Sequence, residues 1–416
     1  MIDAKFARYD AYKDSGVEWL GEAPAHWEIT RNKDTFEERG NLSISGDETL
    51  LTVSHITGVT RRTEKNVNMF MAETMEGYKL CKKGDLIINT MWAWMGALGT
   101  ANEDGICSPA YGVYKPKKYQ HYNHRYFDYL YKTPHAITEM TRNSKGIVSS
   151  RLRLYPKDFF QMRTALPVEI EQTAIADYLD TKTAQIDRQI DLLGQKATQY
   201  GKLKQSLINE TVTRGLDKTV TMKDSGVEWI GEVPAHWKMR HLKNLAEIRG
   251  GKDSKAVDLD DGGYPVYGSG GIFGRASKYL YKKPSVLLGR KGTVDKPLFV
   301  SEPFWSVDTM FYTDINKNVD VKFFYYQCLT IQFGLYEYGS AVPSMAQNVL
   351  RQILFATPEY YEQKIISVYL DKKTAQIDSI IATINAQTDK LKELRKTLIN
   401  DVVTGKIKVV PEGGAA

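Results

Sequence analysis

Two long segments of the chain place apolar residues at steps of three and four. In the first segment these positions are Ile186, Ile190, Leu193, Ala197, Tyr200, Leu203 and Leu207, and in the second they are Ile377, Ile381, Ile384, Thr388, Leu391, Leu394 and Leu398. This spacing is typical of an α-helix with one apolar stripe. Residues 171–213 and 362–404 contain no proline, so each helix can extend over 43 residues. At a rise of about 1.5 Å per residue, each helix would be roughly 65 Å long.

The chain contains an internal repeat: the segments that begin and end its first half return, nearly unchanged, at the beginning and end of its second half. IEQTAIADYLDTKTAQID (170–187) returns as YEQKIISVYLDKKTAQID (361–378), and LINETVT further on returns as LINDVVT. Each half also begins with a repeated head, KDSGVEWLGEAPAHW at 13–27 and KDSGVEWIGEVPAHW at 223–237, with thirteen of fifteen positions identical. We expect the two similar helices to bury their stripes on each other as an antiparallel coiled coil, with the halves related by a pseudo-twofold axis.

The regions between head and tail look unrelated to each other in sequence. Each mixes short apolar runs and glycine turns with one aromatic helix candidate, beginning at His124 or Lys322, whose rings we expect in a core. This pattern predicts an α+β fold with two globular domains separated by the two long repeated helices. The expected boundaries are a first domain at 1–168, a helix at 169–217, a second domain at 218–358 and a helix at 359–410. The heads are expected to be structured loops whose tryptophans pack on a domain edge.

Composition places the chain among folded proteins, with 42% apolar and 25% charged residues. No apolar run is long enough to cross a bilayer, and the charged start MIDAKFARYD is unlike a signal peptide, so we expect a cytoplasmic protein without a membrane segment. Cys81, Cys107 and Cys328 lack metal-ligand spacing and are expected to be small buried hydrophobes.

Positive charge is concentrated in two places. Residues 112–163 contain eleven Lys or Arg against three Asp or Glu, and residues 238–300 contain thirteen against six, although the net charge of the whole chain is only +6. Phosphate binding depends on local positive charge, so the two regions suggest two separate polyanion contacts. Charge alone does not distinguish them from solvated surface.

Motifs of the common enzymes are missing. The chain has no GxxxxGKS or GxxxxGKT phosphate loop, no Asn- or Asp-Pro-Pro-aromatic stretch of an adenine methyltransferase, and no spaced acidic set for two metals. YGSGGIFG (267–274) has Phe273 where a dinucleotide loop needs its third glycine. We therefore predict no catalytic residue, metal site or cofactor in this chain.

The repeated heads and YLDxKTAQID helices closely resemble the specificity subunit of type I restriction–modification enzymes, a system of phage defence, and the resemblance covers nearly the whole chain. It implies a non-catalytic subunit that reads the two halves of a bipartite double-stranded DNA target with two different domains. It also implies docking of two methyltransferase subunits, which hold S-adenosylmethionine, and two restriction/translocase subunits, which use ATP and magnesium. The coiled coil would act as a ruler that fixes the gap between the half-sites.

Several fragments look like pieces of target-recognition domains. They are GDLIINTMWAWMGALG, GICSPAYGVYKP and GIVSSRLRLYPKDF in the first domain and YPVYGSGGIFG, VLLGRKGTV and FWSVDTMFY in the second. GSAVPSMAQNV (339–349) lacks the arginines of SRLRLYP, so the two domains should differ in sequence preference. The DNA-binding candidates are Arg151, Arg153, Lys145, Trp92 and Ser108 in the first domain, and Ser269, Gly270, Arg275, Arg290, Lys291 and Tyr338 in the second.

Two identical partners need two equivalent sockets, which would explain why the heads and tails stay alike. The partner-binding candidates are Trp19, Trp27, Tyr178 and Asp180 in the first half and Trp229, Trp237, Tyr369 and Asp371 in the second. Two rival interpretations remain open. One is a scaffold that assembles partners through its helices without reading DNA, and the other is a fused enzyme with an unrecognised active site.

Overall fold

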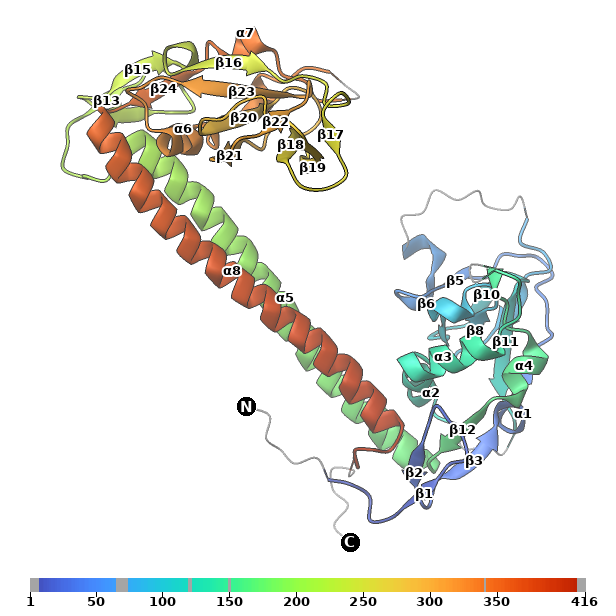
Figure 1. Ribbon diagram of the computed structural model, residues 1–416. Helices are drawn as coiled ribbons and strands as arrows, with labels where there is room; N and C mark the ends of the chain where they lie inside the picture. The colour runs from blue at the N-terminus through green and yellow to red at the C-terminus, as the bar shows by residue number, and fades with distance from the viewer. Residues whose placement is uncertain (1–6, 65–73, 119–121, 149–150, 340–341, 410–416) are drawn as a thin grey trace. The chain divides into compact units, whose positions relative to one another are not determined.

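The computed structural model describes residues 7–64, 74–118, 122–148, 151–339 and 342–409. The chain forms two compact units, Met1–Leu192 with Gln387–Ala416, and Leu193–Ala386. Each unit contains one globular α+β part and a portion of each long helix (Figure 1). The globular part before the first long helix, residues 7–168, is called the first domain, and the part between the two helices, residues 215–359, the second domain.

The two long helices predicted from the apolar stripes are α5 (Glu169–Arg214, 46 residues) and α8 (Tyr360–Val403, 44 residues). Within each unit their segments lie side by side and run in opposite directions (Figure 1). In the first unit Arg395 Nε lies 2.9 Å from Asp187 Oδ1. In the second unit Lys204 Nζ lies 2.7 Å from Asp378 Oδ2. Apolar residues of both helices also join the cores of the domains, so that each domain is built onto the helices.

The first domain is centred on a four-stranded antiparallel sheet of order β4-β11-β8-β9. Its strands are β4 (Phe36–Glu38), β11 (Tyr111–Pro116), β8 (Leu86–Asn89) and β9 (Leu98–Thr100). Two-stranded pairs surround it: β1 (Tyr12–Asp14) with β2 (Glu22–Pro24), β3 (Glu28–Arg31) with β12 (Arg163–Leu166), β5 (Leu51–Ser54) with β6 (Gly58–Arg61), and β7 (Lys79–Cys81) with β10 (Gly105–Cys107). The helices are α1 (Asn32–Thr35), η1 (Arg62–Glu64), η2 (Ala93–Met95), α2 (His124–Tyr131), α3 (Pro134–Asn143) and α4 (Pro156–Gln161).

The second domain is centred on a four-stranded antiparallel sheet of order β16-β23-β20-β21. Its strands are β16 (Ala246–Gly250), β23 (Met310–Ile315), β20 (Ser285–Gly289) and β21 (Leu298–Val300). Beside it lie β13 (Met222–Asp224) with β14 (Glu232–Pro234), β15 (Lys238–His241) with β24 (Leu354–Thr357), and a second sheet of β17 (Asp258–Leu259), β19 (Gly271–Ala276), β18 (Tyr264–Gly268) and β22 (Trp305–Ser306). The helices are η4 (Leu242–Asn244), α6 (Val321–Cys328), η5 (Phe333–Leu335) and α7 (Gln347–Leu350).

The two domains share a frame that their sequences do not reveal. The central sheets have the same strand order, with β4, β11, β8 and β9 matched by β16, β23, β20 and β21. The pairs β1–β2 and β3–β12 are likewise matched by β13–β14 and β15–β24. The difference lies in what is added, because the first domain carries the pairs β5–β6 and β7–β10 where the second carries a four-stranded sheet. A common frame therefore presents different loops.

The short apolar runs of the sequence form strands of the two central sheets, among them β8 and β20. All four residues of β8 and all five of β20 are buried, as expected for strands covered on both faces. The aromatic segments form α2 and α6, and Tyr126, Phe127 and Phe323 are fully buried, which confirms their interpretation as core. The three cysteines are buried, as predicted. YGSGGIFG lies in the antiparallel hairpin of β18 and β19, which is no dinucleotide loop.

Each head contains a two-stranded hairpin, and the segment after it binds a glutamate in the first turn of the long helix that follows the domain. In the first unit Trp27 Nε1 donates to Glu171 Oε1 at 3.1 Å, and His26 Nε2 lies 3.0 Å from Glu171 Oε2. The second unit has the same two contacts at the same distances, made by Trp237 and His236 with Glu362. The rings of Trp27 and Trp237 are 0% exposed, so they pack as expected, but inside a core cluster and not on an open edge. They lie in the core where domain and helix meet.

The end of the other long helix covers the same tryptophan. Gly405 follows α8 with φ of +77°, and a Cβ there would lie 2.4 Å from Pro24 and 3.2 Å from the Trp27 ring. Gly215 follows α5 with φ of +73° and would meet Trp237 at 3.2 Å. A left-handed glycine is the usual end of a helix, because other residues are strained in that conformation. The close approach of the ring adds a second reason for glycine here.

The repeated glutamine of the tails connects the start of each long helix to its domain. Gln172 is fully buried; its Oε1 accepts from the backbone N–H of Asn123 and its Nε2 donates to the carbonyl of Pro167, both at 2.9 Å. Gln363 makes the same pair of bonds with Asp320 and Pro358 at the same distances. The repeated glutamine therefore makes the same contact between long helix and domain in each half of the chain.

We expect Gln172→Ala to lower the free energy of unfolding by about 1–3 kcal/mol, because it leaves a buried amide and a buried carbonyl without partners. Gln185→Ala, an exposed position on the same helix, should change it by less than about 0.5 kcal/mol. Urea titration followed by circular dichroism measures both. Equal effects of the two substitutions would contradict this role of the buried glutamine.

Candidate nucleic-acid interface

Three segments of the first domain meet at the carboxyl end of β8. The N–H of Leu154 donates to the carbonyl of Thr90 at 2.9 Å, and Thr90 Oγ1 donates to the carbonyl of Ala110 at 2.9 Å. These bonds bring together the segments that carry the candidates Trp92, Ser108 and Arg153. The structure thus gathers residues separated by some sixty positions in the sequence at one end of the central sheet.

Arg151 and Arg153 are presented by an irregular hairpin. Lys145 and Arg153 exchange both backbone hydrogen bonds at 2.9 Å, which closes its base. Both arginines are exposed, and among the residues that the structure describes neither guanidinium has a hydrogen-bond or ion-pair partner. Lys145 Nζ lies 3.0 Å from Asp158 Oδ1 and is partly neutralised. Exposed arginines without internal partners are the groups expected for phosphate or base-edge contacts.

Exposed apolar side chains accompany the arginines, and sequence reasoning missed most of them. Ile147 is fully exposed (104%), and Val148, Trp92 and Met91 are exposed as well. Residues 149–150 of the fragment GIVSSRLRLYPKDF lie outside the described residues. An apolar surface beside arginines suits contact with thymine methyl groups or base faces. The only sequence signal was the apolar pair Ile147–Val148 inside a basic region.

The second domain gathers its candidates at the carboxyl end of β20. The N–H of Arg290 donates to the carbonyl of Thr309 at 2.9 Å, and the carbonyl of Arg290 accepts from the N–H of Met345 at 2.9 Å. Ser344 forms isolated bridges with both Lys291 and Tyr338. Arg290, Lys291 and Tyr338 are all exposed and lie together.

The β18–β19 turn joins this second cluster. Ser269 and Gly270 form the turn, and a Cβ built on Gly292 would lie 2.9 Å from Ser269 Oγ, so the turn touches the loop that follows β20. Arg275 is exposed, but it pairs with Pro265 toward the other end of β19. The structure therefore does not bring Arg275 to the turn.

The two clusters occupy the same place on the shared frame. Leu154 bonds to Thr90 in the first domain as Met345 bonds to Arg290 in the second, and the bridge between Lys145 and Arg153 is matched by that between Tyr338 and Ser344. Ser344 of the second domain thus corresponds to Arg153 of the first, and Arg290 of the second domain corresponds to Thr90 of the first. The equivalent surfaces carry cations on different segments, which predicts different binding preferences.

Arg290 is held more firmly than the hairpin arginines. Its Nη1 donates to the carbonyl of Asp308 at 3.3 Å, and its guanidinium lies 5.8 Å from the centre of the Phe311 ring. A planar guanidinium that stacks on an aromatic ring retains donors in the plane of its fork for a partner.

The partner-binding candidates mostly have tasks inside the chain. Trp27 and Trp237 have no exposed ring surface, so they are assigned to internal packing and cannot contact a partner directly unless the head opens. Trp19 is buried with its Nε1 donating to the carbonyl of Arg163 at 3.2 Å, and Trp229 is half-buried. The half-buried Tyr178 and Tyr369 each have a lysine ammonium over the ring, Lys182 at 5.8 Å and Lys373 at 5.9 Å. A role of these two tyrosines, Trp19 and Trp229 in partner binding stays a prediction.

Asp180 and Asp371 bind the aromatic helices of their own domains. Asp180 Oδ1 accepts from Tyr129 OH at 2.8 Å, and Asp371 Oδ1 accepts from Tyr326 OH at 2.8 Å. Burial, together with the neighbouring Asp180, raises the pKa of Tyr129 to about 12, so the phenol keeps its proton as a donor at neutral pH. Each aspartate therefore serves first as an internal acceptor, and any contact with a partner stays a prediction.

Within the described ranges, no three His, Cys, Asp or Glu side chains are grouped so as to hold a metal ion. Within the same ranges, none of the helices combines the length and the apolar character that a membrane crossing requires.

Comparison with known proteins adds independent findings. A family model for the type I restriction modification DNA specificity domain matches residues 234–390. The type I restriction enzyme MjaVIII specificity subunit of Methanocaldococcus jannaschii is 24% identical over 287 residues, which are 61% of this chain and 64% of that protein. The match thus spans less than two-thirds of the length of that relative.

Two solved structures share the fold. A chain from a structure on complex assembly and conformational transition of the type I R-M system matches with a TM-score of 0.68 and 14% identity, covering 92% of this chain and 98% of that one. The HsdS subunit from Thermoanaerobacter tengcongensis matches with a TM-score of 0.54 and 15% identity over the same shares. The likeness supports the mixed arrangement of α+β domains and long helices.

Proposed function

Because the chain belongs to the family of type I restriction–modification DNA specificity subunits, we propose that it reads a bipartite DNA target, one half-site with each of its two domains. The first domain reads through the hairpin of Lys145 to Arg153 and the Thr90–Trp92 segment. The second reads through the Arg290–Gly292 loop, the Ser269–Gly270 turn and Tyr338. Phosphate contacts of lysine and arginine supply affinity and register, and contacts at base edges supply the sequence preference.

One observation carries this proposal. Two surfaces at equivalent places on a common frame present different side chains, which is what two readers of two dissimilar half-sites require. A scaffold without DNA reading would not need exposed arginines at that place, and Arg151 and Arg153 have no side-chain partner among the described residues. The local positive charge of both domains agrees with a polyanionic partner.

The chain is proposed to be the non-catalytic member of an adenine-specific methyltransferase and endonuclease complex. Two methyltransferase subunits would bring S-adenosylmethionine, and two restriction/translocase subunits would bring ATP and magnesium. What this chain contributes is position, because binding energy at the half-sites holds the partners on the DNA where the target base lies.

We further propose that α5 and α8 pack as an antiparallel coiled coil, that a pseudo-twofold axis relates the two halves, and that the helices act as a ruler between the readers. Two observations support this arrangement. Within each unit an ion pair joins the antiparallel helices, and Gln172 and Gln363 make matching hydrogen bonds in the two halves. The division into a domain, a long helix, a second domain and a second long helix is part of this proposal, with the helices ending at Arg214 and Val403, before the expected bounds of 217 and 410.

Arg151→Ala should weaken binding of the assembled complex to cognate DNA by about tenfold, since one lost arginine contact costs about 1–3 kcal/mol. Filter binding across a range of salt concentrations measures the affinity and its salt dependence. Arg61→Ala is the charge-matched control, because Arg61 forms an ion pair with Glu103 on the first domain, with 2.5 Å between Nη2 and Oε2.

The two variants separate the possible outcomes. Weaker binding to cognate DNA with Arg151→Ala, and unchanged binding with Arg61→Ala, supports the proposal that the first domain reads DNA through this surface. Equal affinity of the wild-type complex for all DNA, unaffected by either substitution, would favour the scaffold. Methyl transfer by the purified chain alone would show a fused enzyme.

A further inference from the structure

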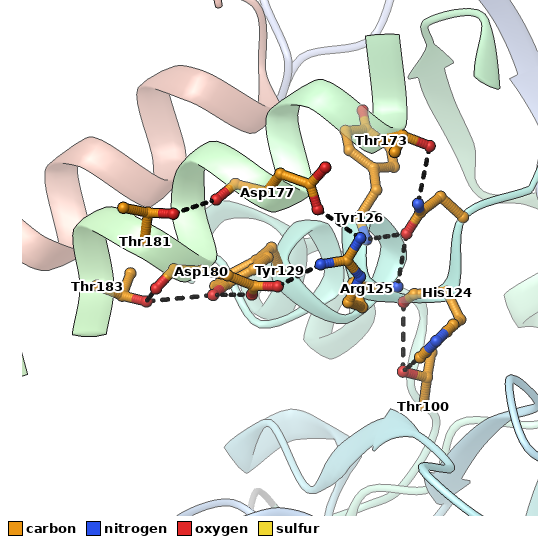
Figure 2. Close-up of polar contacts among 11 residues, drawn as sticks. Thr100, His124, Arg125, Tyr126, Tyr129, Thr173, Asp177, Asp180, Thr181 and Thr183 are labelled. Carbon is orange, nitrogen blue, oxygen red and sulfur yellow. Dashed lines mark hydrogen bonds and ion pairs between the residues drawn. The ribbon is translucent and has the colours of Figure 1, made fainter. Parts of the chain in front are cut away.

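A charged contact joins the first domain to α5 outside their shared apolar core. Arg125 Nη1 donates to Asp180 Oδ2 at 2.5 Å and Arg125 Nη2 donates to Asp177 Oδ1 at 2.6 Å. Figure 2 shows the guanidinium reaching from α2 to both carboxylates on α5. Tyr129, one turn further along α2, donates to the other oxygen of Asp180 at 2.8 Å.

This contact supplies something that the apolar core does not. Apolar packing between α2 and α5 is non-directional and tolerates small rotations and shifts. A guanidinium bound to two carboxylates three residues apart on one helix fixes both position and rotation, because its donors lie in a rigid plane. The Asp177 hydrogen bond, followed by that to Asp180, raises the pKa of Arg125 further above its usual value, so the guanidinium stays charged.

The second unit contains a weaker version of the same contact. Lys322 of α6 binds Asp371, and Tyr326 donates to Asp371 at 2.8 Å, as Tyr129 does to Asp180. The repeat of the tails places Val368 where the first helix has Asp177, so the second contact has one carboxylate and a lysine. An ammonium is a point charge without a fixed plane, and it orients its domain less tightly.

We propose that Arg125, Asp177 and Asp180 form a clasp that fixes the orientation of the first domain on α5, and that this clasp limits which gap lengths in the DNA target are accepted. The second part rests on the proposed function. These are positioning residues. They do not need to touch DNA, because a domain that rocks on its helix can reach half-sites one base pair nearer or further away.

The test measures orientation without DNA and then gap discrimination with it. Nitroxide labels are placed at Thr138→Cys on α3 and Gln185→Cys on α5, both exposed, while the native cysteines are buried. We expect the electron-paramagnetic distance distribution of the full chain to become about twice as wide in Asp177→Ala/Asp180→Ala. Asp180→Asn, which keeps an acceptor for Tyr129, should give an intermediate width. Arg125→Lys keeps the positive charge and loses the fixed plane of donors, so it should also give an intermediate width.

Controls and DNA binding complete the experiment. Arg61→Ala removes an ion pair within the first domain and should leave the distribution unchanged. In the complex with methyltransferase, the double variant should discriminate about tenfold less against a gap changed by one base pair, with affinity for the isolated first half-site unchanged.

An unchanged distance distribution in the double variant, or equal broadening in Arg61→Ala, would overturn the clasp whether or not DNA binds. A broadened distance distribution in the double variant, together with wild-type discrimination between gap lengths, would overturn the proposed effect of the clasp on gap length. Absence of sequence-specific DNA binding in the wild type would instead refute the proposed function, while the distance measurement still decides the clasp.

Discussion

Trp27→Ala is expected to lower the free energy of unfolding by about 3–5 kcal/mol, the range for removing a large buried aromatic side chain. The ring is 0% exposed and lies against Gly405, at the end of α8. Its loss leaves a cavity that glycine cannot fill. It also removes one hydrogen bond to Glu171, whose Oε1 accepts from the Trp27 indole and from the Tyr9 hydroxyl, so the loss of the indole donor adds to the effect while the carboxylate keeps a partner. Thermal and urea unfolding followed by circular dichroism measures the effect.

Two further tryptophans make this prediction specific. Trp237→Ala removes the matching ring of the second unit and should have an effect of similar size, because burial and the bond to Glu362 are the same. Trp92→Ala removes a ring that is 49% exposed and should change stability by less than about 1 kcal/mol while weakening DNA binding. Loss of methyltransferase binding with full stability in Trp27→Ala would instead return Trp27 to the predicted role in partner binding.

Lengthening α5 and α8 together is expected to change the gap of the recognised DNA target. An insertion of 21 helix-forming residues in the middle of each helix adds about 31 Å at 1.5 Å per residue and keeps the seven-residue phase of the stripe. One turn of DNA spans about 34–36 Å, or 10–10.5 base pairs. The lengthened chain should therefore select a gap about nine or ten base pairs longer. It should bind the original target at least about a hundredfold more weakly, as expected when one of two half-sites is lost.

A shorter insertion serves as the control for geometry. Eleven residues in each helix add about 16 Å, close to half a turn of DNA, which would direct the two readers to opposite faces of the duplex. That variant should bind every gap weakly, although each half-site should still bind alone. Selection of the original gap by either lengthened chain would contradict the ruler.

The long helices were predictable because their signal is local and periodic. The stripe at steps of three and four and the absence of proline predicted α5 and α8 to within a few residues. The core role of the aromatic segment after His124 was likewise predictable from its composition, since several large rings in ten residues rarely remain exposed.

The shared frame of the two domains was not predictable from one sequence. The strands β8 and β20 differ in residues but share a requirement for burial, and many apolar sequences meet that requirement. Strand order depends on pairing between segments far apart in the chain, as between β11 and β4, which no local pattern encodes.

The roles of the repeated residues were partly misread for a physical reason. Identity between two repeats shows that a position has the same task in both halves and leaves open whether its partner is another chain or the same chain. Trp27 and Gln172 face their own domain and helix, and burial decides this only once the fold is known. Arg151 and Lys291, by contrast, lie on exposed surface, as expected for groups that bind DNA.

Mapping adenine methylation in the DNA of cells that express this chain with its cognate methyltransferase tests the central claim most directly. The account predicts one split motif with two dissimilar halves and a fixed gap, because two different readers are joined through helices of fixed length. A continuous palindrome, or methylation without a motif, would contradict the assignment of the two domains as readers and would leave the duplicated helices with a role in assembly alone.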